Sequence, residues 1–134
     1  MRQFTLDEAR ETLEQVRPLA ERMVALRARL RELEGDLAGW RSSLTANGKG
    51  RGAAGEQFER DRAEARGELA SAVTGLEELG VLVKGIDEGL VDFPSIHPVS
   101  GEEIEFCWHI GEAEIGYWHR PEEGFAGRRP LPFS

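Results

Sequence analysis

The chain has 134 residues, enough for one domain with a modest hydrophobic core but not for two independent cores. Its net charge is −8, which argues against the basic face that binding to nucleic acids or anionic membranes requires. No apolar run approaches the roughly 18 residues of a membrane span. The charged first turn and the lone Cys107 indicate no signal region and no internal disulfide, so we expect a cytoplasmic protein.

Residues 5–44 carry the pattern of a long amphipathic helix. Thr5 and Glu8 have the spacing of a capping box, in which each side chain accepts a hydrogen bond from the other residue's backbone. Apolar residues then recur at three- and four-residue steps, as in a coiled coil. Pro18 interrupts this pattern, and because proline lacks a backbone N–H we expect the helix to be kinked or broken there.

A second amphipathic segment occupies residues 55–79, and Gly80 follows it as a C-terminal cap. Residues 45–55 contain four glycines and no apolar cluster, which predicts a flexible turn. Beyond Pro18 the two helices have matching lengths of roughly 40 Å, so we expect an antiparallel helical hairpin. The arm before Pro18 is left over, and it must pack on the C-terminal region or on another chain.

The apolar pattern changes its period from about 3.6 residues to about 2 after the second helix. This change predicts a four-stranded antiparallel β-meander over residues 81–120, with a glycine turn at 87–89. The tail, residues 121–134, has the glycine and proline spacing of a loop. The fold class is therefore α+β, with a helical hairpin and a small sheet in one domain, residues 1–134.

The turns of the meander set its register, and the register decides which face of the sheet each side chain occupies. A four-residue turn at 98–101 and a two-residue turn at 111–112 gather the large apolar side chains on one face. We assign that face to the helices. It contains Val91, Phe93, Ile104, Phe106, Trp108, Ile110, Ile115 and Tyr117, with His119 at its end.

The opposite, outer face of the predicted sheet collects side chains that can bind a metal ion. It brings Asp92 across from Cys107, and His109 across from Glu114. Thiolate, imidazole and carboxylate together suit a divalent ion such as zinc. No dense ligand motif such as CxxC is present, and a solvated face with one His–Glu pair accounts for the same residues. We therefore favour the structural interpretation.

Other candidate sites are weaker. The basic loop at 48–52 lacks the spacing of a phosphate-binding P-loop. Arg128 in the tail can hold an anion or a carboxylate on the sheet, although a surface charge is the simpler interpretation. A carboxylate beside Cys107 would raise the pKa of its thiol and make it a poorer nucleophile. No catalytic residue can be assigned.

The apolar faces of the two predicted helices also indicate whether the chain self-associates. The first helix extends past the second, and two antiparallel helices rarely cover a long seam completely. The predicted register places Trp118 on the outer face, where exposed aromatic side chains favour interfaces. We therefore expect a symmetric homodimer.

Three segments of the chain are distinctive: ELGVLVKGIDEGLVDFP (78–94), CWHIGEAEIGYWH (107–119) and EGFAGRRPL (123–131). Together with the opening FTLDEA, they resemble an uncharacterised bacterial family, domain of unknown function 2203. The resemblance covers nearly the whole chain and implies no activity, cofactor or partner.

Single positions also fit the family's pattern. They are Asp92, Phe93, Pro94, Cys107, Trp108, Gly111, Glu112, Trp118, His119, Gly124, Gly127 and Arg128. His109 departs from the pattern, because relatives carry a basic residue such as arginine there. The resemblance therefore shifts the candidate site toward Asp92, Cys107, Glu112, His119 and Arg128.

The sequence supports two interpretations of function. The favoured one is a self-associating helical-hairpin module without enzymatic activity. The alternative is a protein that binds a metal or a small ligand on the meander, with hydrolysis among the activities of such a site. Its candidate ligands are Asp92, Cys107, His119, Glu112 and Glu114.

Overall fold

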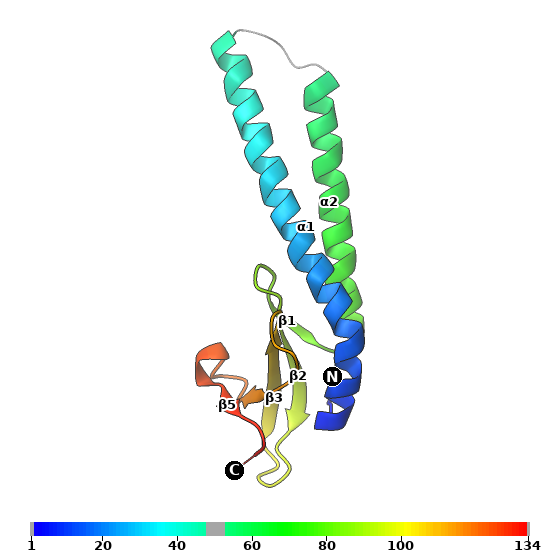
Figure 1. Cartoon of the computed structure of the whole chain (residues 1–134), viewed down its shortest axis with the longest axis vertical. Coiled ribbons are helices and arrows are strands. Elements are labelled where there is room, and N and C mark those ends of the chain that lie inside the picture. Colours follow the sequence, from blue (N-terminus) through cyan, green and yellow to red (C-terminus); the bar gives the residue numbers. More distant parts are fainter. Residues whose placement is uncertain (1, 48–52, 134) are drawn as a thin grey trace.

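The computed structural model of the chain describes residues 2–47 and 53–133. Helices α1 (Leu6–Asn47) and α2 (Ala53–Glu78) pack against each other as an antiparallel hairpin, as predicted. The hairpin projects well beyond a small sheet that lies beside its lower end (Figure 1). Residues 48–52, in the predicted turn, lie outside the described residues. Within the described ranges, neither helix is long and apolar enough to cross a membrane.

α1 is one continuous helix through Pro18, so the predicted break there is wrong. Pro18 itself is exposed, but Leu13, Val16 and Met23 on either side of it are buried. A proline inside a helix costs about 3 kcal/mol. Each large apolar side chain that is buried contributes roughly 1.5–3 kcal/mol. Packing on both sides of Pro18 therefore outweighs the lost hydrogen bond.

The predicted N-terminal cap of α1 and C-terminal cap of α2 are confirmed, whereas α1 ends at Asn47 and not at 44, and α2 begins at Ala53 and not at 55. The Thr5 backbone N–H donates to Glu8 Oε1 at 2.9 Å, and the Glu8 N–H donates to Thr5 Oγ at 3.1 Å. These bonds lower the pKa of Glu8, because they favour its ionised form. After α2, Gly80 adopts a φ of 96°, the left-handed conformation of a C-terminal cap.

The arm before Pro18, which comprises residues 2–5 and the first turns of α1, packs on the protein's own sheet, because Ala9, Leu13 and Val16 share a buried cluster with side chains of β2 and β3. The Phe4 and Phe93 rings meet edge to face with centroids 5.3 Å apart. The Phe4 N–H donates to the Pro94 carbonyl at 2.7 Å, and the Ser95 hydroxyl donates to the Phe4 carbonyl. The apolar face of the arm is therefore used within the chain and gives no support to the predicted homodimer, which stays a prediction.

The sheet has five antiparallel strands in chain order, not the predicted four. The extra strand, β5, comes from the tail that was predicted as a loop, and a short 3₁₀ helix, η1, precedes it. Pro130 has no backbone N–H to donate. An edge strand tolerates this, because one of its two sides has no partner strand. The elements are β1 (Leu82–Gly85), β2 (Leu90–Ile96), β3 (Glu103–His109), β4 (Tyr117–His119), η1 (Phe125–Gly127) and β5 (Arg129–Pro130).

The predicted register of β2 with β3 is confirmed. Val91 pairs with Trp108, and Asp92 pairs with Cys107. Gly101 in the connecting turn has a φ of 76°, which explains why glycine stands there. The inner face of this pair packs on the helices, and its buried side chains include Val91, Phe93, Ile104, Phe106 and Trp108.

The predicted register of β3 with β4 is wrong by one residue. Phe106 pairs with Trp118, not with Tyr117. The slip exchanges the faces of β4, because neighbouring side chains point to opposite sides of a strand. Trp118 therefore lies in the core, 7% exposed, while Tyr117 and His119 join the outer face. Trp118 offers no exposed aromatic surface for a dimer interface.

The slip arises because 111–112 is not a two-residue turn. The Glu112 N–H donates to the His109 carbonyl at 3.1 Å, and the chain then continues through a wider loop before β4 begins. Trp108 Nε1 donates to the Glu112 carbonyl at 2.9 Å. Arg17 of α1 donates to the carbonyls of Glu112 and Ala113. Contacts from α1 and β3 thus shape this connection.

Candidate metal centre

Three side chains from adjacent strands meet on the outer face of the sheet. They are Asp92 of β2, Cys107 of β3 and His119 of β4, here called the Asp–Cys–His cluster. One potential ligand atom from each residue lies within 4.8 Å of the others. Asp92 pairs directly with Cys107, and His119 follows Tyr117, the partner of Cys107, by two residues. The register of three strands therefore builds the cluster.

The tail of the chain contributes to the cover of this outer face. In Figure 1, η1 lies on the side of the sheet away from α1. The guanidinium carbon of Arg128 lies 3.8 Å from the centroid of the Tyr117 ring and 4.6 Å from that of Phe125. Cys107 and His119 have no exposed surface, and Asp92 is 2% exposed. The cluster is thus fully buried although it faces away from the helices.

The hydrogen bond of His119 Nδ1 determines what its other ring nitrogen can do. Nδ1 lies 2.7 Å from the Arg120 carbonyl oxygen. A carbonyl only accepts, so Nδ1 carries the hydrogen. Nε2 lies 3.1 Å from Asp92 Oδ2. It either carries a second proton, which makes the ring cationic, or it offers a lone pair. A histidine ligand of a metal typically has this arrangement, with its other ring N–H on a backbone carbonyl.

Asp92 has one oxygen with partners and one without. Oδ2 contacts His119 and lies 3.5 Å from Lys84 Nζ. Oδ1 is buried and has no hydrogen-bond partner among the described residues. Leaving a buried carboxylate oxygen unpaired is costly, so such an atom calls for an explanation. A bound cation provides one.

Lys84 and Glu105 form an ion pair beside the cluster, with Nζ and Oε1 3.1 Å apart. Burial raises the pKa of Glu105. Burial alone would lower the pKa of Lys84, but the hydrogen bond and charge of Glu105, with the charge of Asp92, outweigh it and raise that pKa. The predicted register already placed Glu105 on this outer face, two residues before Cys107 on the same strand, but not among the candidate ligands. Sequence reasoning missed Lys84.

The Cys107 thiol is held in its neutral form. Burial, and after it the charge of Asp92, raise the pKa of Cys107 from 9.0 to about 12. A neutral thiol is a poor nucleophile. This agrees with the prediction that a neighbouring carboxylate raises the pKa. A bound divalent ion would take the place of the thiol proton, because a coordinating thiol is deprotonated.

The other predicted ligands lie outside the cluster. Glu112 is fully engaged, because Oε1 accepts from the His109 N–H at 2.9 Å and Oε2 pairs with Arg128. Glu114 is exposed in the loop before β4. The predicted alignment of Glu114 with His109 is wrong, because β4 begins only at Tyr117 and His109 Nε2 lies 3.8 Å from Glu112. The structure therefore brings together three of the five candidate ligands.

The cluster fits a zinc ion chemically. Zinc accepts thiolate, imidazole and carboxylate ligands at about 2.0–2.3 Å, which places ligand atoms about 3.5 Å apart around a tetrahedral ion. The three atoms would therefore have to approach by only about 1 Å. Two negative charges, from Asp92 and the Cys107 thiolate, would balance the ion, while Lys84 and Glu105 balance each other.

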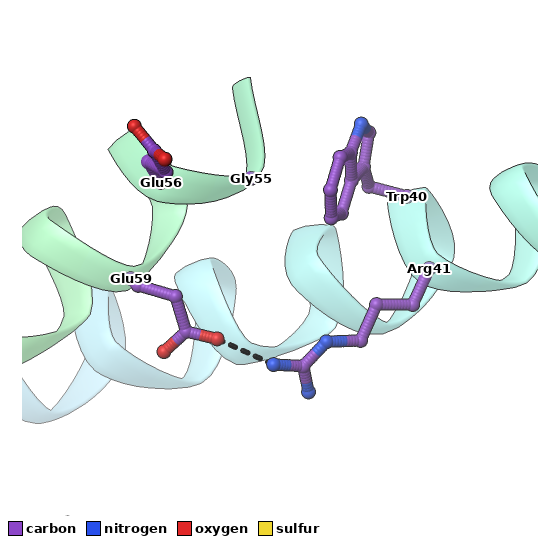
Figure 2. Close-up of a pocket in the computed structure, with 5 residues that line it drawn as sticks. All are labelled: Trp40, Arg41, Gly55, Glu56 and Glu59. Atoms are coloured by element: carbon purple, nitrogen blue, oxygen red, sulfur yellow. Dashed lines mark hydrogen bonds and ion pairs between the residues drawn. The ribbon is translucent and has the colours of Figure 1, made fainter. Parts of the chain in front are cut away.

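A separate hollow lies at the far end of the helical hairpin (Figure 2). It has a volume of about 200 Å³ and is lined by Trp40, Arg41, Gly55, Glu56 and Glu59. Arg41 pairs with Glu59, and the Trp40 indole fills the space that a side chain at position 55 would need. The ion pair is half exposed, so it contributes at most about 1 kcal/mol.

Comparison with known proteins identifies a family for the chain. No curated protein matches it, and no solved structure does. One family model, described as an uncharacterized conserved protein (DUF2203), matches residues 2–131, which include both helices, all five strands and the Asp–Cys–His cluster. The chain therefore belongs to the DUF2203 family of uncharacterised conserved proteins.

Proposed function

We propose that this protein binds a divalent transition-metal ion, with zinc as the best fit, at the Asp–Cys–His cluster. One observation carries the proposal. Three ligand-type side chains are buried together, and Asp92 Oδ1 among them has no hydrogen-bond partner in the described part of the chain. Thiolate and imidazole with a carboxylate select zinc over magnesium or calcium, which prefer oxygen ligands.

A metal-free ionic cluster is the competing explanation. In that case His119 is a cation paired with Asp92, and Lys84 is paired with Glu105. Charges balance, but Asp92 Oδ1 stays unpaired, and burying ions without full hydrogen bonding costs several kcal/mol. A metal at the cluster satisfies that oxygen and uses the Nε2 lone pair of His119. The metal therefore accounts for more of the geometry.

The proposal can be tested by native mass spectrometry of protein purified without chelators or a histidine tag, with elemental analysis of the same sample. We expect one zinc ion per chain. Cys107→Ala removes the only thiolate, and His119→Gln removes the imidazole, so each should lose the ion. His109→Gln is the matched control, because His109 lies on the same face outside the cluster.

Two results would contradict the proposal. One is wild-type protein that carries no metal and takes up none from excess zinc against a weak chelator. The other is Cys107→Ala protein that keeps a stoichiometric ion. Circular dichroism of each variant should accompany the measurement, so that loss of metal is not confused with loss of folding.

A further inference from the structure

We infer that Glu105 is the fourth ligand of the metal ion, which makes the centre a closed, structural one. The inference rests on the proposed metal function and adds the residue that completes the coordination. Asp92, Cys107 and His119 offer three ligand atoms, and a structural zinc ion takes four protein ligands. The cluster is buried, so a neighbouring side chain is better placed to supply the fourth ligand than a molecule from solvent.

The strand register places Glu105 next to the cluster. Glu105 pairs directly with His119 of β4, and it precedes Cys107 by two residues on the same face of β3. The residue is 6% exposed, and its Oε1 lies 3.9 Å from His119 Nδ1. Glu105 therefore lies beside two of the three ligands, on the same buried face.

The Lys84 ammonium bridges the carboxylates of Asp92 and Glu105. Its Nζ lies 3.5 Å from Asp92 Oδ2 and 3.1 Å from Glu105 Oε1. Burial raises the pKa of Glu105, and the charge of Asp92 and a hydrogen bond with its side chain raise it further. Two carboxylates held this close together favour cations beside them. Lys84 supplies one positive charge, and a metal ion would supply the rest.

The two oxygens of Glu105 can serve different partners. The hydrogen bond from Lys84 uses Oε1, so Oε2 can turn to the metal while the ion pair stays. A carboxylate that binds a metal usually has a hydrogen-bond partner as well, and Lys84 would fill that role. As the side chains stand, Glu105 is outside the group of ligand atoms that lie within 4.8 Å of one another. Rotation of its flexible side chain would bring Oε2 to the ion.

The charges at the centre also balance with Glu105 as a ligand. The negative charges of Asp92, Glu105 and the Cys107 thiolate would equal the positive charges of a divalent ion and Lys84. The competing role for Glu105 is that of a counter-ion to Lys84 alone. In that role Glu105 changes the affinity for the metal through its charge, but the atoms that bind the metal stay the same.

The test uses Co²⁺, because the visible bands of bound Co²⁺ depend on the atoms that coordinate it. We expect Glu105→Gln to shift these bands in the cobalt-saturated protein and to weaken cobalt binding by about ten-fold or more. Glu112→Gln is the matched control, because it removes the same charge from a carboxylate whose charge also reaches Cys107. Glu112 lies outside the cluster, so its variant should leave the bands unchanged.

Two further variants separate coordination from charge. Lys84→Gln should leave the bands unchanged, because Lys84 contacts the ligands and not the metal. The double variant Lys84→Gln/Glu105→Gln should show the same shifted bands as Glu105→Gln. It removes both charges of the ion pair, so it keeps the test valid if the single variant is destabilised by an unpaired ammonium.

The outcomes distinguish this inference from the metal proposal. If wild type shows the thiolate-to-cobalt absorption and both Glu105 variants keep the wild-type visible bands, Glu105 is not a ligand and the metal site stands. Weaker binding with unchanged bands would show that Glu105 acts through its charge, which also overturns the inference. Folded wild-type protein that binds no cobalt would overturn both.

Discussion

Cys107 links the protonation of one buried side chain to the stability of the metal-free protein. Burial and the nearby Asp92 charge raise the pKa of Cys107 to about 12 in the folded state, against 9.0 for an ordinary thiol. The folded protein therefore keeps a proton that the unfolded chain releases. The thiol's contribution to stability is fully present below about pH 9 and is lost as the pH rises toward about 12.

We predict that raising the pH above 9 destabilises metal-free wild-type protein more than the Cys107→Ala variant. One proton changes the free energy of unfolding by at most about 1.4 kcal/mol per pH unit. Urea denaturation of both proteins with a chelator at several pH values measures the difference. Parallel pH profiles would show that the thiol is not held neutral by the fold. Zinc-loaded wild type should lack the effect, because its thiol has already lost the proton.

In strand β4, a shift of one residue in register decides which side chains lie in the core and which lie at the Asp–Cys–His cluster. The β2–β3 pairing could be predicted, because a four-residue turn with Gly101 matches the alternation of both strands. The β3–β4 pairing could not, since the shape of the connection depends on hydrogen bonds from Arg17 and Trp108. With the predicted register, His119 would face the helices. The resemblance to a family shifted the candidate site toward it.

The register can be tested by truncating the two aromatic residues of β4. Trp118→Ala should destabilise the protein by about 3–5 kcal/mol, because it removes a large buried side chain. Tyr117→Ala should cost far less, about 1 kcal/mol, because Tyr117 is exposed and loses mainly its contact with Arg128. Urea denaturation measures both. The reverse order would favour the register with Tyr117 inside.

At the scale of the whole molecule, the arm of α1 joins the hairpin to the sheet. The sequence predicted both helices and the surplus length of the first, but it left the partner of the arm open. The partner is the sheet, through Phe4 and β2. Such a long-range contact joins residues about 90 positions apart, and local periodicity carries no information about it. The same limit applies to the tail strand β5.

The arm's contribution to folding can be measured with two phenylalanine variants. Phe4→Ala should destabilise the whole protein by about 3–5 kcal/mol, since Phe4 is buried in the core shared by α1 and the sheet. Phe125→Ala is the matched control, with an expected cost of about 1 kcal/mol, because Phe125 is half exposed. Equal costs in thermal or urea unfolding would mean that the arm is not part of the cooperative core.

The central claim is that Asp92, Cys107 and His119 form one metal site. The most direct measurement is the near-ultraviolet thiolate-to-cobalt absorption of the cobalt-loaded protein. This absorption should appear with one equivalent of Co²⁺, disappear in Cys107→Ala and persist in His109→Gln. In Asp92→Asn and His119→Gln, the affinity of the protein for cobalt should fall at least ten-fold. Folded wild-type protein without this absorption would contradict the claim and leave a metal-free ionic cluster as the account of these residues.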